Sequence, residues 1–375
     1  MDSISFDLIV SGSIAAVESV KLVRSLRRLG AKVYPHLTTG AKQFITEAAL
    51  EWACEGSDNK KINNTNFHLS TNHSLIIAPA SANTITKLNL GIADTPPSTL
   101  ALSYLGNSRP IFILPNMHHS MFKAPIIQQH LDSLRNNPWI TGLDALFEED
   151  KLKMPPTVVL ADQIAHHYNK RSIKQKKVLL TMGPTREYVD DVRVISNIST
   201  GKLGKLIAEE LYRLGLETHV VCGPAEYKPN TYTRLYPITT NKEMLEATDI
   251  VMSQGIDACI FSAAVSDYTP TERFDGKIIS TSNHLTINLS KAKKVIGHCN
   301  PPSGIKVGFK LECSLNDKDY LDIANKYLRK YSLSLLVIND LKYIKNNDQH
   351  SARIFEQKQN NLRETRCSTK KEIAQ

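Results

Sequence analysis

Short apolar runs alternate with amphipathic stretches along most of the chain. The stretch 6–40 predicts a strand, a tight glycine turn, an amphipathic helix that a glycine ends, and a second strand. The stretch 176–224 has the same order of elements after a longer loop between its first strand and its helix. Each stretch therefore predicts the opening of a βαβ unit.

Further apolar runs bounded by turn signals continue this alternation, at 74–80, 109–115, 257–265, 305–312 and 333–340. Continuous apolar runs of this length are typical of buried parallel strands, and helical segments such as 316–331 lie between them. The pattern therefore predicts two doubly wound α/β domains, each with three layers.

The polar and basic segment 166–177 has no apolar periodicity and is the best candidate for a linker. We place the boundary near residue 173, which gives a first domain at 1–172 and a second at 173–375. The length of 375 residues agrees with two domains of about 100 to 200 residues each.

The composition, with 41% hydrophobic and 22% charged residues, is that of an ordinary globular protein. No apolar stretch approaches the ~18 residues that span a bilayer, and the first residues lack the basic region of a signal peptide. The six cysteines show neither CxxC pairing nor metal-ligand spacing. We therefore expect a cytoplasmic protein without a membrane partner, a disulfide framework or a metal site built from its own side chains.

The formal net charge of +9 favours anionic partners, either nucleic acid or phosphorylated small molecules. The basic residues are spread over periodic segments, and they form neither a basic helix nor a surface interleaved with aromatic residues. This distribution favours phosphorylated small molecules and predicts no nucleic-acid partner.

Ligands of doubly wound domains bind beyond the carboxyl ends of the strands, where helix N-termini present free N–H groups to anions. In the first half these ends carry a Gly-Ser turn and several polar side chains, namely Ser13, Thr38, Thr39, Ser81, Asn83 and Ser98. A Gly-Ser turn before a helix is often only a helix cap, so a phosphate site depends on the other loops.

In chain order, "GSIAA", "PASANT", "GIAD" and "PNMHHSM" resemble the amino-terminal half of a family of coenzyme A synthesis. This is the family of bifunctional phosphopantothenoylcysteine decarboxylase/phosphopantothenate-cysteine ligases, also called CoaBC or Dfp. The resemblance implies a flavodoxin-like domain that binds FMN through Ser13, Thr38, Asn83 and Ser98. It also implies that Met117 and His118 bind the substrate, His118 standing where the family has an asparagine.

Two departures from the family pattern concern the decarboxylation. The resemblance assigns the catalytic histidine to His68 only with a deletion; an ungapped alignment leaves Thr65 there, and His73 is a second candidate. The family's lid supplies a proton-donating cysteine, whereas the corresponding stretch 141–156 contains none. A complete decarboxylase and a flavin domain with impaired chemistry therefore both remain open.

The loop "GPTREYVDDVRVISNISTGKLG", residues 183–204, carries the strongest motif of the second half. Glycines begin and end it, hydroxyl side chains fill it, and three cations lie within it, namely Arg186, Arg193 and Lys202. This combination suits a triphosphate and an acyl phosphate. Ion pairs that only stiffen a long loop are the alternative, and we expect both interpretations to hold in part.

The loop agrees with the ligase half of the same family, which implies a Rossmann-like, CTP-dependent domain. The resemblance implies that Arg193, Asn197 and Lys277 are catalytic and act on an acyl-cytidylate. It further implies CTP binding by Ala263, Asp267, Lys277, Val295, Phe309, Lys326 and Lys330. Mg²⁺ would bridge the phosphates with few protein ligands. The family's "KNPDI" is replaced by "KAKKV" at 291–295, which leaves the nucleotide selectivity open.

The sequence therefore predicts a bifunctional enzyme that joins 4'-phosphopantothenate to cysteine with CTP and then decarboxylates the product with FMN. The main alternative is an active ligase fused to a flavin domain whose decarboxylase activity is impaired or lost. A non-catalytic flavin-binding module and a nicotinamide oxidoreductase are disfavoured, the latter because no GxGxxG follows either first strand. The resemblance also implies a homo-oligomer, with trimers of the flavin domain and dimers of the ligase domain.

Overall fold

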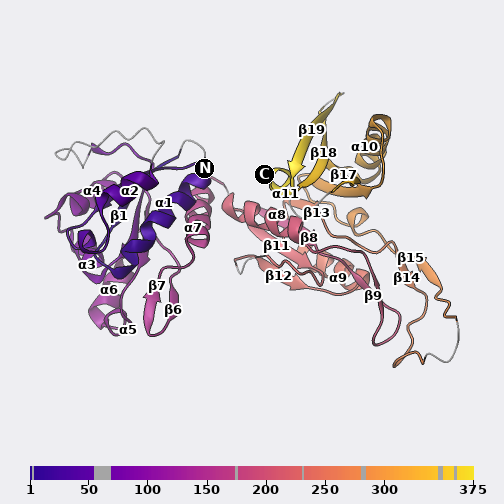
Figure 1. Ribbon diagram of the computed structural model, residues 1–375, viewed down its shortest axis with the longest axis horizontal. Coiled ribbons are helices and arrows are strands. Elements are labelled where there is room, and N and C mark those ends of the chain that lie inside the picture. Colours follow the sequence, from indigo (N-terminus) through magenta and orange to yellow (C-terminus); the bar gives the residue numbers. More distant parts are fainter. Residues whose placement is uncertain are drawn as a thin grey trace. The chain divides into compact units, whose positions relative to one another are not determined.

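The computed structural model describes residues 1, 4–54, 69–173, 176–229, 232–279, 284–344, 349–358 and 361–375. The chain divides into two compact units, Met1–Asn169 and Lys170–Gln375 (Figure 1). In the described ranges, no helix is both long enough and apolar enough to cross a membrane.

A parallel five-stranded sheet with the order β2-β1-β3-β4-β5 forms the centre of the first unit. Its strands are β1 (Ser5–Val10), β2 (Lys32–Leu37), β3 (Ser74–Ala80), β4 (Ile111–Pro115) and β5 (Ile140–Gly142). This order is that of flavodoxin-like doubly wound domains. The fold class predicted for the first half is therefore confirmed.

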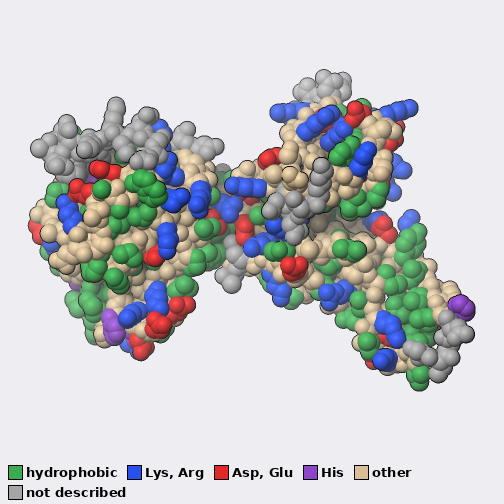
Figure 2. All heavy atoms as spheres, in the orientation of Figure 1, with side chains coloured by type: hydrophobic (Ala, Val, Ile, Leu, Met, Phe, Trp, Pro, Cys, Tyr) green, Lys and Arg blue, Asp and Glu red, His purple; other side chains and the backbone are tan. Residues whose placement is uncertain are grey.

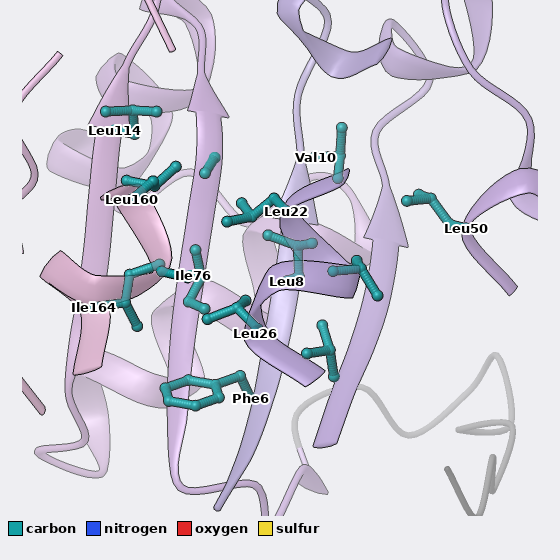
Figure 3. Close-up of a cluster of buried hydrophobic side chains, with 14 of the residues drawn as sticks. Phe6, Leu8, Val10, Leu22, Leu26, Leu50, Ile76, Leu114, Leu160 and Ile164 are labelled. Atoms are coloured by element: carbon teal, nitrogen blue, oxygen red, sulfur yellow. The ribbon is translucent and has the colours of Figure 1, made fainter. Parts of the chain in front are cut away.

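Helices cover both faces of this sheet. They are η1 (Ile14–Glu18), α1 (Ser19–Arg28), η2 (Ala41–Gln43), α2 (Glu47–Ala53), α3 (Ala82–Leu90), α4 (Pro96–Gly106), α5 (His119–Phe122), α6 (Pro125–Arg135) and α7 (Thr157–Lys170). Leu22 and Leu26, one turn apart on α1, pack with Leu8 of β1 and Ile164 of α7 on one face (Figure 3). The other face is packed by α3, α4 and α6.

The segment that the sequence suggested as a linker is partly helical. Helix α7 continues to Lys170, and every residue from Leu160 to His166 is buried, so the packing of the first unit includes the start of this segment. Of the described residues in the segment 166–177, residues 171–173 and 176 lie outside helices and strands, and β8 begins at Lys177.

The carboxylate of Asp7 is fully buried in the middle of β1. It accepts hydrogen bonds from the Tyr104 hydroxyl at 2.6 Å and from Asn72 Nδ2 at 2.9 Å, and it lies 2.8 Å from His36 Nε2. Burial raises the pKa of Asp7, but its contacts with His36, Ser70 and Tyr104 outweigh this effect and hold the pKa below its usual range. The buried charge therefore links several elements of the first unit.

The second unit contains an eight-stranded sheet with the order β12-β11-β8-β13-β16-β17-β18-β19. Its strands are β8 (Lys177–Met182), β11 (Glu217–Cys222), β12 (Arg234–Pro237), β13 (Ala258–Phe261), β16 (Ile305–Glu312), β17 (Leu335–Ile344), β18 (Gln349–Lys358) and β19 (Asn361–Thr369). The first six are parallel in the order of a Rossmann fold, as predicted. The antiparallel extension by β18 and β19 was not predicted.

Helices flank this sheet on both faces, with α8 (Lys202–Arg213) and α11 (Lys370–Ala374) on one face. The helices α9 (Asn241–Met252) and α10 (Asp317–Tyr331) and the short η4 (Val295–Gly297) lie on the other. Two small antiparallel pairs extend from the unit, β9 (Arg186–Tyr188) with β10 (Val194–Ser196) and β14 (Tyr268–Pro270) with β15 (Leu289–Lys291). Capping boxes at Thr240 and Asn316 begin α9 and α10.

Candidate functional site

A cavity of about 400 Å³ opens beyond the carboxyl ends of β1, β2 and β3 in the first unit. Its volume lies in the range of about 300 to 1,000 Å³ that is usual for small-molecule sites. Its polar lining comes from loops after these strands, from α3 and from the first turn of α4, and includes Thr38, Thr39, Ser81, Asn83, Thr84, Lys87, Thr95 and Ser98. Thr38, Asn83 and Ser98, which the sequence placed in one site, therefore share this cavity.

The wall of the cavity contains a close approach of two backbones. A Cβ atom on Gly12 would lie only 3.0 Å from the Cα and carbonyl carbon of Gly40. Glycine at position 12 therefore lets the loop after β1 contact the loop after β2 directly.

Ser13 lies beside this cavity, although it is not among the residues that line it. Its hydroxyl accepts from Ala15 N–H at 3.3 Å, which caps η1, and donates to Asn116 Oδ1. The buried Asn116 donates from Nδ2 to the carbonyl of Leu152 at 2.7 Å. Sequence reasoning missed Asn116, whose only signal was a polar residue directly after an apolar strand.

A hairpin of β6 (Leu146–Glu148) and β7 (Lys151–Lys153) binds the segment that follows β4. Leu152 donates its N–H to the Met117 carbonyl at 3.1 Å, and His119 donates its N–H to the Asp150 carbonyl at 2.9 Å. His118 is exposed, and its Nδ1 lies 2.9 Å from the Ser120 hydroxyl. The hairpin is formed by the cysteine-free stretch 141–156, so this stretch contacts the backbone of the predicted substrate-binding residues.

His68 and Thr65 lie outside the described residues. His73, the second candidate, lies at the amino end of β1, where its Nδ1 accepts from Ser5 N–H at 3.1 Å. Since the cavity opens at the carboxyl ends of the strands, the structure places His73 at the opposite edge of the sheet.

In the second unit, the loop 183–204 is fixed against the segment that follows β13. Ala264 donates its N–H to the Gly183 carbonyl at 2.9 Å, and Ser266 donates its N–H to Thr185 Oγ1 at 3.0 Å. Asn197 Nδ2 donates to the carbonyls of Val265 at 3.0 Å and of Ala264 at 3.3 Å. Asn197 and the half-buried Ala263 therefore lie in one structured region beyond the strand ends.

Arg193 takes part in the ion pair that the sequence offered as an alternative. Its guanidinium contacts the carboxylate of Asp190, which has no exposed surface, and also donates to the Ile278 carbonyl at 3.3 Å. Burial raises the pKa of Asp190, but hydrogen bonds from Ile278, Arg193 and Val192 outweigh this effect and hold the pKa far below its usual range. Lys277 itself is exposed and lies next to Ile278.

Asp267 makes an ion pair with Lys294, one of the residues that replace the family's "NPD". Lys310 of β16 lies near this pair: burial lowers its pKa, but Glu312, Tyr327 and Asp267 together raise it above the usual value. The carboxylate of Asp267 therefore lies among cations at the carboxyl end of the sheet.

The remaining predicted nucleotide residues are distributed over both faces of the sheet. Val295 is buried in η4, and Lys326 and Lys330 are exposed on α10, on the same face. Phe309 is half-buried against the core beneath α8 and α11, on the other face. The structure therefore brings Asp267 and Val295 to one region but does not bring the Phe309 ring to the lysines of α10.

Among the described residues, no group of three or more His, Cys, Asp or Glu side chains is arranged to hold a metal ion.

Comparison with known proteins gives matches over both units. Residues 2–169 match the family described as Flavoprotein, and residues 173–375 match the family described as DNA/pantothenate metabolism flavoprotein C-terminal domain. The coenzyme A biosynthesis bifunctional protein CoaBC of Methanocaldococcus jannaschii is 37% identical over 341 residues, which cover 88% of this chain and 82% of that protein.

The protein of the same description from Thermococcus kodakarensis is 33% identical over 345 residues, covering 89% of this chain and 85% of that protein. Among solved structures, the DNA/pantothenate metabolism flavoprotein from Streptococcus pneumoniae is similar, with 32% identity and a TM-score of 0.46. The matched region covers 53% of this chain and 95% of the Streptococcus pneumoniae chain.

Proposed function

The chain belongs to the family of bifunctional coenzyme A biosynthesis proteins, and from this premise we propose that each unit catalyses one of two successive reactions. The second unit joins 4'-phosphopantothenate to cysteine at the expense of CTP, and the first unit decarboxylates the product to 4'-phosphopantetheine. The relatives described as bifunctional match both halves of the chain, which disfavours the alternative of a ligase fused to an inactive flavin domain.

One observation carries the ligase assignment. The loop 183–204, with its glycines, hydroxyls and Arg193, is bound to the segment 263–267 at the carboxyl end of the sheet. In a Rossmann-like domain this edge is where nucleotides bind. Phosphates are recognised there by backbone N–H groups and by fixed cations.

The ligase reaction has two steps. The carboxylate of 4'-phosphopantothenate attacks the α-phosphate of CTP, which forms an acyl-cytidylate and releases pyrophosphate. The cysteine amine then attacks the activated carbonyl, forms the amide bond and releases CMP. Arg193 and Asn197, both fixed by the contacts described above, stabilise the acyl-cytidylate, and Lys277 balances the charge that develops on it.

CTP contacts would come from Ala263 and from the cation-rich region around Asp267 and Val295, with Lys326 and Lys330 of α10 on the phosphates. Phe309, whose ring lies on the other face of the sheet, would lie outside this site. Mg²⁺ would enter with CTP and be held largely by phosphate oxygens.

The cavity of the first unit fits FMN in size and in its hydroxyl and amide lining. When bound, FMN supplies an acceptor for two electrons during the decarboxylation. We propose that Ser13, Thr38 and Ser98 bind its phosphate group or ribityl chain, and that Asn83 binds the ring. Met117 and His118 would then contact the substrate beneath the hairpin, with His68 as the catalytic base.

A homo-oligomer is also proposed. Figure 2 shows hydrophobic side chains gathered over the arm that carries β14 and β15. Large apolar residues exposed there include Tyr268, Phe274, Ile279, Leu285 and Leu289. Exposed apolar surface of this kind is typical of protein interfaces, and light scattering of the purified chain tests whether it assembles.

The test of the ligase assignment is release of pyrophosphate that requires both CTP and 4'-phosphopantothenate. The variant Lys277→Gln removes the proposed catalytic charge and should lose this activity while remaining folded. Lys242→Gln is the matched control, because Lys242 lies on α9 with a side chain that is 86% exposed. Full activity of the Lys277 variant would overturn the assignment of this residue. The complete absence of CTP-dependent turnover in the unaltered chain would overturn the ligase function.

A further inference from the structure

Two consecutive aspartates, Asp190 and Asp191, bind both neighbours of Lys277 in the chain. Asp190 accepts a hydrogen bond from the N–H of Ile278 at 3.1 Å, and Asp191 accepts one from the N–H of Gly276 at 3.0 Å. The N–H of Asp191 in turn donates to the Gly276 carbonyl at 3.1 Å. The backbone is therefore fixed immediately before and immediately after Lys277.

These contacts belong to a longer pairing between two segments, which we call the aspartate turn (188–193) and the lysine segment (273–278). Arg273 donates to Asp191 Oδ1 at 2.7 Å, and its guanidinium lies 4.8 Å from the centre of the Tyr188 ring. Phe274 donates its N–H to the Val189 carbonyl at 3.0 Å. The lysine segment thus contacts the aspartate turn along its whole length, although more than 80 residues separate the aspartates from their partners.

Both oxygens of the Asp190 carboxylate accept hydrogen bonds from the surrounding segments. It accepts from the N–H groups of Val192 at 2.8 Å, Arg193 at 2.6 Å and Ile278 at 3.1 Å, and from the Arg193 guanidinium. A carboxylate offers acceptors on both oxygens, whereas an asparagine amide would turn an N–H₂ group toward one of these donors. The turn therefore requires an aspartate at this position, fully removed from water.

Lys277, in contrast, directs no side-chain hydrogen bond or ion pair to another residue in the part of the chain that the structure describes, and its side chain is exposed. A long side chain on an unsupported exposed segment would lose much conformational entropy on binding an anion. Fixing the backbone on both sides removes part of that cost in advance, and it limits where the ammonium group can reach.

We propose that Asp190 and Asp191 are positioning residues of the ligase, which hold Lys277 beside the loop 183–204 so that its ammonium meets the reacting phosphate. This inference rests on the function proposed for the second unit. A misplacement of about 1 Å can reduce turnover by about 100-fold, so loss of either aspartate should act mainly on kcat.

The test compares Asp191→Ala with Asp275→Ala in the full-length chain. Asp275 is a matched control because it is an exposed aspartate of the same lysine segment and no hydrogen bond to it is seen among the described residues. For Asp191→Ala we expect kcat for CTP-dependent pyrophosphate release to fall about 10- to 100-fold, with a smaller change in KM for CTP. The Asp275 variant should stay within about twofold of the unaltered enzyme. Equal kcat values for the two variants would overturn the proposal.

A double-mutant comparison shows whether Asp191 acts through Lys277. In a Lys277→Gln background, Asp191→Ala should cause no further loss of the residual activity, because the positioned ammonium is already gone. A further loss by the same factor as in the unaltered enzyme would show an independent effect and contradict the proposal.

Hydrogen exchange tests the contact without any ligase activity, so it separates failure of the proposed function from failure of this positioning role. Asp191→Ala should accelerate exchange of the amides in the lysine segment 273–278 relative to the unaltered chain, and Asp275→Ala should not. Unchanged exchange at Gly276 in the Asp191 variant would overturn the positioning role even if the enzyme is an active ligase.

Discussion

Replacing Gly223 by alanine should remove most of the ligase activity, because this residue packs against the start of the loop 183–204. Gly223 follows β11, and a Cβ atom built on it would lie 1.8 Å from the carbonyl oxygen of Pro184 and 2.8 Å from the carbonyl carbon. The Gly223 backbone cannot move away freely, since its N–H donates to the Met182 carbonyl at 2.9 Å and its carbonyl accepts from Ala225 N–H at 2.7 Å. The loop at Pro184 must therefore shift.

The size of this shift follows from the geometry. The distance between the new methyl group and the Pro184 oxygen must increase from 1.8 Å to at least 3.0 Å, a displacement of about 1.2 Å. Displacements of this size at a reacting centre reduce turnover by about 100-fold. Overpacking should also lower the free energy of unfolding by about 1 to 3 kcal/mol.

The assay is pyrophosphate release with CTP and 4'-phosphopantothenate, together with thermal unfolding of the same samples. Gly297→Ala is the control in the same unit, because its methyl group would have only a ring carbon of Tyr331 nearby, at 3.9 Å. We expect a loss of about two orders of magnitude in kcat for Gly223→Ala and little change for Gly297→Ala. A Gly223→Ala enzyme with unaltered kcat would refute the packing argument.

Three further predictions concern other parts of the chain. Asp7→Asn should lower the free energy of unfolding at neutral pH by about 3 kcal/mol. Because the pKa of Asp7 is lower in the folded chain than the unfolded value of 3.8, the stability that Asp7 contributes is present above that value and is lost as the pH falls through the folded pKa. The difference between the two proteins in chemical unfolding should therefore shrink below about pH 4, and a constant difference would contradict this reasoning. Under native conditions a thiol reagent should react rapidly with Cys313 alone, since the other five cysteines are buried. Burial also raises the pKa of the Cys54 thiol to about 11. Rapid labelling of Cys54 would contradict this prediction. Thr38→Val should weaken FMN binding in a fluorescence titration by about tenfold through loss of one hydrogen bond, whereas Thr86→Val, on α3 and outside the cavity lining, should not.

The strands and their order along the chain could be predicted from the sequence because buried parallel strands form continuous apolar runs. The run 305–312, for example, is strand β16 with the same bounds. The antiparallel pair β18 and β19 could not be predicted in this way, since β18 (Gln349–Lys358) contains mostly polar and charged residues. Its position depends on pairing with β17 through backbone hydrogen bonds, which leave no pattern in the sequence.

Of the candidate sites, too, one part could be predicted from the sequence and another part could not. The loops at the strand ends could be found from glycines and hydroxyls, and Thr38, Asn83 and Ser98 do share a cavity. The partners of these loops come from distant segments, as Asn116 does for Ser13 and Gly276 for Asp191. A single sequence contains no signal for such pairings, because they arise only when the strands are placed side by side.

The most direct test of the central claim follows the carboxyl carbon of cysteine through both reactions. The purified, FMN-loaded chain is supplied with 4'-phosphopantothenate, CTP and cysteine labelled at its carboxyl carbon. Labelled carbon dioxide should be released at a rate that depends on both CTP and 4'-phosphopantothenate, and Lys277→Gln should abolish the release. Accumulation of labelled phosphopantothenoylcysteine without carbon dioxide would contradict the bifunctional account and leave only the ligase.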